Sequence, residues 1–386
     1  MHSRNGALQL SATDLSNFLG CKHRTALDMA VATHAREKPA KSDDPLLQLL
    51  FDRGLDHEKQ YVDWLKAQPL RVEDLSHIDS LTHPDELVAA THEAMKQGAD
   101  VIVQGALRDA HWFGKPDILF RVETSSELGA WSYEVYDTKL SKKAKAGAIL
   151  QLSLYTAMVA KVQGTTPKRF YIVSPRMAIG KPSPDEVSKR VTGPESMMVL
   201  EYPTSDYAAY FRLVRQRMEE TVVREAIEVA EANYPDPVEH CAVCRWNRTC
   251  DDKRHADDHI SLVAGIARMQ RRELATLGIT TRKQCGQIWP LPSVPRRGSL
   301  DVYENLHRQA ALQLRSTRQE IEYELRPVVS YRPASDTDVG SWGRSRLGGA
   351  VGRLRGSGRR DKTERCKMCG RSDSRHVFTS LSDRRR

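Results

Sequence analysis

The sequence lacks any long run of apolar residues. No stretch approaches the roughly 18 consecutive apolar residues that a membrane-spanning helix requires, so we expect no membrane partner. The opening stretch, MHSRNGALQL, also lacks the apolar core of a secretory signal peptide. These absences predict a cytoplasmic protein, and in that compartment the seven cysteines are better explained as metal ligands than as disulfides.

Excess charge is absent from most of the chain. The 386 residues carry a net charge of +9, but residues 330–386 contain 15 Lys and Arg against 6 Asp and Glu, which accounts for all of it. The basic composition therefore does not indicate whether the folded part binds nucleic acid. Residues 328–386 have no hydrophobic period and few apolar residues, which predicts a disordered tail. Such a tail either binds nucleic acid through its phosphates or results from truncation or a frameshift of a longer chain.

The hydrophobic pattern before this tail predicts an α/β core with a mixed sheet. Ser11-Ala-Thr-Asp14 is a capping box that opens a helix. Three strands separated by glycine-bearing breaks indicate an antiparallel meander. In sequence order, the pattern predicts helices at 45–66 and 84–97, strands at 100–114, 115–123 and 131–140, a helix at 145–164, strands at 168–175 and 196–203, and helices at 205–233 and 300–325.

Two acidic residues on neighbouring strands of the meander form the first candidate site. The stretch EVYDTKL places Asp137 and Lys139 two residues apart, and such side chains project from the same face of a strand. Asp117 begins the preceding strand, and adjacent strands lie about 4.8 Å apart, so both carboxylates can meet at one metal ion. Mg²⁺ prefers one or two carboxylates plus water, and a lysine stabilises charge that develops on a phosphate. This combination favours phosphodiester hydrolysis over a solvated ion pair.

Four short motifs resemble, in this order, those of the RecB-type PD-(D/E)xK nucleases. Each motif is weak alone, but four in the right order are a strong signal, and the resemblance covers residues 8–260. The motifs are RGLDHE with His57 and Glu58, the Pro116-Asp117 pair, Asp137-x-Lys139, and QLSLY with Gln151 and Tyr155 as Q-x-x-x-Y. The resemblance implies a restriction-endonuclease-like core with a mixed central sheet flanked by helices, a helical N-terminal part and a cysteine-rich C-terminal part.

The resemblance also implies how a metal ion is bound. His57, Asp117 and Asp137 would hold Mg²⁺ or Mn²⁺, with the backbone carbonyl of residue 138 as a further ligand. Glu58 is the alternative to His57, although it faces differently on a helix. The structural alternative for His57 is a histidine on a helix surface. The structural alternative for Asp117, Asp137 and Lys139 is a charge cluster on the sheet.

Three further residues and the activity follow from the same resemblance. Lys139 would position water or stabilise the transition state, while Gln151 and Tyr155, which share one helix face, would orient the site or the strand. The alternative for Gln151 and Tyr155 is the polar edge of a core helix. The implied activity is hydrolysis of DNA phosphodiester bonds by an exonuclease of DNA repair or recombination, acting on single strands or duplex ends.

The cysteines form the second candidate site. CAVCRWNRTC places Cys241, Cys244 and Cys250 at C-x₂-C-x₅-C, one ligand short of a four-cysteine site. Cys21 is the candidate for the fourth ligand. This arrangement, with LSATDLSNFLGC leading into Cys21, resembles the iron–sulfur staple of AddB-type and CRISPR-associated exonucleases, which implies a [4Fe–4S] cluster. Zn²⁺ fits the same ligands, and His240 is a substitute for one of them.

The remaining cysteines suggest no site. Cys285 has no partner nearby in the sequence and is expected to be a buried thiol. Cys366 and Cys369 form an isolated C-x₂-C, and two ligands do not make a metal site.

The whole pattern predicts three parts and leaves two rival functions. The parts are a nuclease domain with its staple at 1–260, a helical extension at 261–327 and the basic tail at 328–386. Longer RecB-like nucleases continue into a second nuclease-like portion or a helicase portion, so a helicase domain or subunit is an expected partner. The rivals are a catalytically silent DNA-binding module and a zinc-stapled structural subunit of a helicase–nuclease complex.

Overall fold

A computed structural model describes residues 1–4, 6–40, 45–141, 144–176, 193–224, 226–316, 325–326 and 377–378. The chain divides into two compact units, Met1–Lys253 and Arg254–Arg386. The division into parts at 1–260, 261–327 and 328–386 stays a prediction. Apart from 377–378, the basic tail lies outside the described residues, and so do Cys366 and Cys369.

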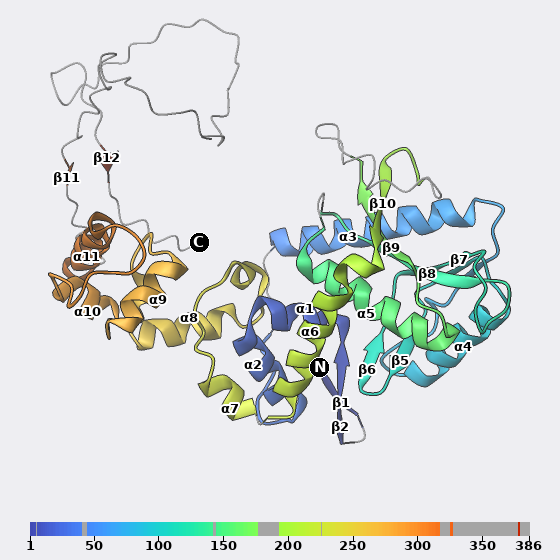
Figure 1. Cartoon of the computed structure of the whole chain (residues 1–386), viewed down its shortest axis with the longest axis horizontal. Helices are drawn as coiled ribbons and strands as arrows, with labels where there is room; N and C mark the ends of the chain where they lie inside the picture. Colours follow the sequence, from blue (N-terminus) through green and yellow to red (C-terminus); the bar gives the residue numbers. More distant parts are fainter. Residues whose placement is uncertain are drawn as a thin grey trace, which may run out of the picture. The chain divides into compact units, whose positions relative to one another are not determined.

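A six-stranded mixed sheet forms the centre of the first unit (Figure 1). Its spatial order is β10-β9-β8-β7-β4-β3. The pairs β8/β9 and β3/β4 are parallel, and the other pairs are antiparallel. The strands are β3 (Val72–Asp74), β4 (Val101–Val103), β7 (Ile118–Val122), β8 (Ser132–Thr138), β9 (Arg169–Pro175) and β10 (Met197–Pro203). The antiparallel meander of β4, β7 and β8 is confirmed.

Helices cover both faces of this sheet, which confirms the expected restriction-endonuclease-like α/β architecture. Alternate side chains of β8 point to opposite faces: Val135 packs in the larger core, whereas Tyr136 packs in the smaller one. The larger core lies beneath α1 (Ala12–Gly20), α4 (Pro84–Lys96), α5 (Ala146–Gln163) and α6 (Thr204–Val222). The smaller core lies beneath α3 (Pro45–Lys66), on the other side of the sheet from α5 (Figure 1). All seven residues of β8 are buried.

The prediction of one strand over 100–114 is wrong. This segment contains β4 and two further strands, β5 (Leu107–Asp109) and β6 (Trp112–Gly114), which belong to a second sheet with β1 (His2–Arg4) and β2 (Ala7–Ser11) in the order β1-β2-β6-β5. Gln104 and Ala110 adopt φ values of 56° and 52°, and this left-handed backbone breaks the strand at both points. Because neither residue is a glycine, the alternating pattern concealed both breaks.

In the first unit, the predicted first residues of the helices match the structure better than the predicted last residues. The capping box of Ser11 and Asp14 is confirmed, and α3 spans the predicted 45–66. The long helix predicted over 205–233 is interrupted, because α6 ends at Val222 and α7 (Ala226–Glu231) follows. The break falls after Thr221 and Val222, whose β-branched side chains lower helix propensity. The other helical segments are α2 (Lys22–Ala32), η2 (Glu239–Val243) and α8 (Asn247–Ala256).

The second unit is helical. Its core contains Ile260, Leu274, Tyr303 and the thiol of Cys285, which is buried as expected. The helix predicted over 300–325 ends at Arg315, where Ser316 takes an extended conformation as the C-cap. The elements are η3 (Ile260–Leu262), α9 (Arg268–Thr276), α10 (Arg282–Gln287), α11 (Leu300–Arg315), and the short antiparallel pair β11 (Leu325–Arg326) and β12 (Val377–Phe378).

Candidate active site

The structure brings Asp117 and Asp137 together across two antiparallel strands. Ile118 of β7 pairs with Tyr136 of β8, so Asp117, one residue earlier, lies opposite Asp137. Both carboxylates lie on the side of the sheet that α5 covers, and they are close enough to share a hydrogen bond. Like charges directly opposite each other destabilise a sheet, so this pair costs stability.

Thr138, the middle residue of the D-x-K motif, holds Asp117 in this position. Its backbone N–H donates to Asp117 Oδ2 over 2.8 Å, and its hydroxyl donates to the same oxygen over 3.0 Å. The Thr138 side chain was not among the residues predicted from the sequence. The signal that could have identified it is its place between Asp137 and Lys139, on a strand next to the one that Asp117 precedes.

Burial and mutual repulsion dominate the electrostatics of the acidic pair. Asp137 has no exposed side-chain surface. Burial, and then the neighbouring Asp117, raise the pKa of Asp137 to about 8, although Lys139 acts in the opposite direction. Burial disfavours the charged form of Lys139, but Asp137 and Asp117 outweigh it and raise the pKa of that ammonium. The lysine ammonium forms an ion pair with Oδ2 of Asp137 and also donates to the Thr138 carbonyl over 3.2 Å.

Helix α5 places two polar side chains against this pair. The Gln151 amide lies 3.4 Å from Oδ1 of Asp137 and donates to the Tyr155 hydroxyl over 3.2 Å. Tyr155 is buried, and a Cβ at Gly114 would lie only 2.9 Å from its ring, so β6 can approach α5 closely only because residue 114 is a glycine. Gln151 and Tyr155 therefore face the acids from one helix face, four residues apart.

Helix α3 presents its two candidate residues differently. His57 is buried and donates from Nε2 to the Val173 carbonyl over 3.1 Å, and that carbonyl also accepts from the Lys139 backbone N–H. Burial, and then the Asp117 charge, raise the pKa of Glu58, so its carboxylate lies in the field of the acidic pair. The role of His57 as a metal ligand stays a prediction, and Glu58 is the α3 residue that interacts electrostatically with Asp117.

Gln104 is a second residue that sequence reasoning missed. Its side-chain amide donates to the Glu58 carboxylate, and its backbone N–H donates to the Asp117 carbonyl over 2.8 Å. It therefore links α3 to the start of β7. The pattern contained no signal for this role, because the link depends on the left-handed backbone at Gln104.

The chemistry of the acidic pair suits a hard divalent cation. Within the described part of the chain, no three His, Cys, Asp or Glu side chains are grouped so as to hold a metal ion. However, Asp137 Oδ2 is buried, and its ion pair with the Lys139 ammonium is the interaction with which a metal ion would compete for this oxygen. Mg²⁺ binds one or two carboxylates and completes its coordination with water, so two adjacent carboxylates fit it.

Cys244 lies within electrostatic range of two other candidate cysteines, although no three described Cys, His, Asp or Glu side chains are grouped so as to hold a metal ion. Burial raises the pKa of the Cys244 thiol, and the neighbouring Cys21 and Cys241 raise it further. A Cβ at Gly20, next to Cys21, would lie 3.2 Å from the ring of His240, next to Cys241. The chain thus brings residue 21 to residues 240–244, across more than 200 intervening residues.

The environment of the other ligand candidates is also defined. Cys250 lies on α8, where its backbone N–H donates to the Trp246 carbonyl. Cys21, Cys241, Cys244 and Cys250 form no disulfide. His240 uses Nε2 to accept a hydrogen bond from the Arg24 guanidinium, which occupies one of its two ring nitrogens.

A mixed sheet with helices on both faces, and an Asp-Asp-Lys cluster on its central strands, defines a restriction-endonuclease-like class of protein. The family model of the PD-(D/E)XK nuclease superfamily matches residues 23–251. The match covers more than half of the chain, and the protein belongs to this superfamily. No curated protein matches the sequence. Among the described residues, no helix has the length and apolar character needed to cross a membrane.

Proposed function

We propose that the protein is a metal-dependent deoxyribonuclease that hydrolyses phosphodiester bonds. The observation that carries this proposal is the half-buried Asp117 against the fully buried Asp137, with Lys139 beside them. Placing a buried carboxylate against a second one disfavours folding, and strongly perturbed pKa values are typical of sites that perform chemistry. Membership of a nuclease superfamily supports the same function.

In this proposal Asp117 and Asp137 hold Mg²⁺ or Mn²⁺, and either Glu58 or His57 of α3 completes the protein ligands. The bound ion would lower the pKa of a water molecule enough for it to attack phosphorus at neutral pH. Thr138 fixes the orientation of Asp117 through two hydrogen bonds, so one carboxylate is positioned before substrate arrives. Such preorganisation is where a protein contributes most to a reaction of this type.

The other residues act on charge and position. The Lys139 ammonium lies beside Asp137 Oδ2, where it can stabilise the negative charge that develops on the phosphate oxygens. Gln151 links Asp137 to Tyr155 and orients either the carboxylate or the strand. We further propose an exonuclease role in DNA repair or recombination, with a helicase domain or subunit as partner.

We also propose that Cys21, Cys241, Cys244 and Cys250 hold a [4Fe–4S] cluster, with Zn²⁺ as the alternative. The electrostatic interaction of Cys244 with Cys21 and Cys241 supports a cluster that these cysteines share as ligands. Four thiolates are the donor set of such clusters. Absorption near 400 nm is expected for iron–sulfur and absent for zinc. It would also separate this proposal from a zinc-stapled structural subunit.

The nuclease proposal is tested with DNA that carries a label on one end. Purified protein with Mn²⁺ should shorten the DNA, and the same protein with EDTA should leave it intact. Comparing 5′ and 3′ labels on single-stranded and duplex DNA would then give the polarity and the preferred substrate. A protein that binds these substrates but leaves them intact with Mn²⁺ and with Mg²⁺ would be the catalytically silent module instead.

A further inference from the structure

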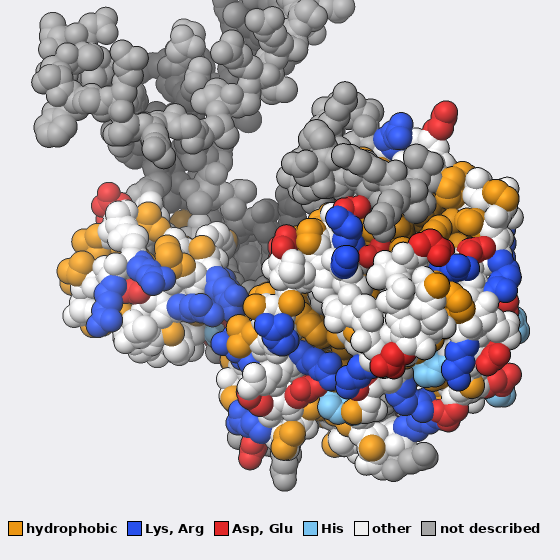
Figure 2. All heavy atoms as spheres, turned by 45° about the vertical axis from the view of Figure 1, so that its right-hand side comes forward, with side chains coloured by type: hydrophobic (Ala, Val, Ile, Leu, Met, Phe, Trp, Pro, Cys, Tyr) orange, Lys and Arg blue, Asp and Glu red, His pale blue; other side chains and the backbone are white. Residues whose placement is uncertain are grey.

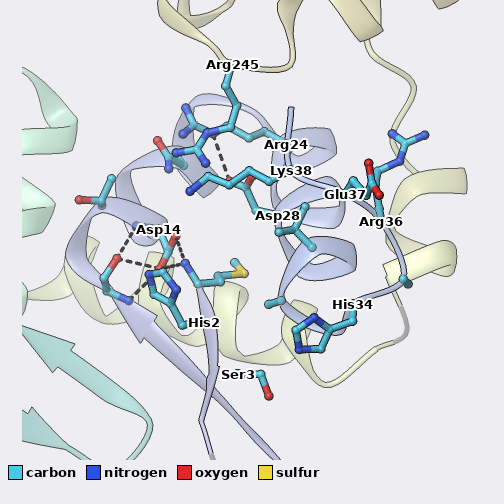
Figure 3. A pocket seen from close by; sticks show the side chains of 17 residues that line it. His2, Ser3, Asp14, Arg24, Asp28, His34, Arg36, Glu37, Lys38 and Arg245 are labelled. Carbon is cyan, nitrogen blue, oxygen red and sulfur yellow. Dashed lines mark hydrogen bonds and ion pairs between the residues drawn. The ribbon is translucent and has the colours of Figure 1, made fainter. Parts of the chain in front are cut away.

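A cavity of about 820 Å³ lies in the first unit, away from the acidic pair (Figure 3). It is formed by β1 and β2, by α1 and α2, by the segment 34–38 after α2, and by Arg245 from the cysteine-rich region. None of the residues assigned to cleavage above lines it. Its volume is in the range of pockets that bind small molecules or nucleotides.

Basic side chains converge on one side of this cavity. Figure 3 shows Arg24, Lys38 and Arg245 side by side above Asp28. Arg24 is buried, while Lys38 and Arg245 are exposed. Among the described residues, the head groups of Lys38 and Arg245 have no hydrogen-bond or ion-pair partner. On the face shown in Figure 2, Lys and Arg side chains of this unit also gather along its lower part.

Most acids of the cavity are already neutralised. Asp14 binds the Met1 ammonium over 2.7 Å, and Asp28 accepts from Arg24 over 3.2 Å and from the Trp246 indole over 2.7 Å. Arg36 is held over the Trp246 ring at 5.7 Å. The field in the cavity is therefore positive. Burial, and then the N-terminal ammonium, lower the pKa of His2, and Lys38 and Arg245 act in the same direction.

We propose that this cavity binds a phosphate group of a single-stranded nucleic acid, with Lys38 and Arg245 as the contacting cations and Arg24 as the fixed charge behind them. Unpaired cations around a concavity are the usual recognition elements for phosphate. The cavity admits a nucleotide, whereas the rigid cylinder of a duplex cannot enter it. This proposal rests on the proposed function in one respect: the ligand is a nucleic-acid strand. Binding in the cavity does not require that the protein cleaves the strand.

The bound phosphate is either an internal phosphate of the strand's backbone or the terminal 5′-phosphate. A backbone phosphate predicts equal binding of oligonucleotides with and without a 5′-phosphate. A terminal phosphate predicts tighter binding of the phosphorylated strand and competition by a deoxynucleoside monophosphate. This comparison distinguishes the source of the phosphate, and the cavity variant below tests its place.

The test is fluorescence anisotropy of a labelled oligodeoxynucleotide in EDTA over a series of salt concentrations. The double variant Lys38→Ala/Arg245→Ala should bind about tenfold more weakly than wild type. Its plot of log affinity against log salt should be shallower by about 0.7, because one single-strand phosphate contact is lost. The matched control is Arg212→Ala/Arg217→Ala, which removes the same charge from exposed positions on α6 and should change neither value.

Equal affinity and salt dependence of the cavity variant and wild type would overturn the proposal. A loss of the same size in the α6 control would also overturn it, because binding would then follow total charge and not the cavity. Since the assay contains EDTA, a protein that binds through the cavity but does not cleave with Mn²⁺ would contradict the nuclease function alone.

Discussion

Asp137→Ala and Lys139→Ala should each reduce the rate of DNA cleavage by about 1,000-fold or more, in line with the loss of one essential charge-stabilising group. Asp137 is the fully buried member of the acidic pair, and Lys139 is the cation that contacts it. Neither side chain supports the apolar core, so the folded structure should persist. Single-turnover cleavage of end-labelled DNA measures the effect, and circular dichroism checks the fold.

The matched control for these variants is Glu134→Gln. Glu134 is a second buried acid on β8, but its carboxylate accepts a hydrogen bond from Tyr171 and faces away from Asp117. Cleavage by Glu134→Gln should therefore stay near the wild-type rate. Wild-type rates in both Asp137→Ala and Lys139→Ala would remove the catalytic assignment. A similar loss in the Glu134 variant would indicate a general effect of disturbing β8.

Replacing Cys21 by Ser should release iron and lower the melting temperature of the whole first unit. Cys21 lies beside Cys241 and Cys244, so a cluster there would close a loop of about 220 residues. Cross-links that close long loops restrict the unfolded chain most in the entropic account, and ligands that assemble only on folding couple metal binding to stability. Iron content and thermal unfolding, measured on the same preparation, test this expectation.

Cys285→Ser is the control for the cysteine prediction. Cys285 lies in the separate core of the second unit, where burial raises the pKa of its thiol to about 11. Its replacement should leave iron content unchanged. If Cys21→Ser retains full iron and the wild-type melting temperature, the fourth ligand lies elsewhere. Zinc in place of iron in the wild type would support the alternative metal with the same ligands.

The acidic pair was predictable because it depends on local rules. Strand alternation places Asp137 and Lys139 on one face, and antiparallel pairing of consecutive strands places Asp117 opposite. The bounds of α3 were predictable from the amphipathic pattern over 45–66, despite Gly54 inside it. In each case the information lies within a short stretch of sequence, or in two stretches joined by a short connection.

The missed features depend on contacts between distant segments. Whether His57 or Glu58 faces the acids depends on how α3 is rotated against the sheet, and a helical pattern cannot determine that rotation. Gln104 holds Glu58 only because its backbone is left-handed. The basic cavity joins Lys38 to Arg245 across some 200 residues, and no periodicity in the sequence connects them.

The central claim is that Asp137 belongs to a divalent metal site, and isothermal titration calorimetry with Mn²⁺ tests it most directly. Burial and the neighbouring Asp117 raise the pKa of Asp137 to about 8, so below that pH the ion must displace a proton to bind. Wild-type protein should bind Mn²⁺ at pH 8, and up to about 100-fold more weakly at pH 6, because each pH unit below the pKa costs about a factor of ten. Asp137→Asn should bind no Mn²⁺ at either pH. Equal binding by Asp137→Asn and wild type at pH 8 would contradict the account.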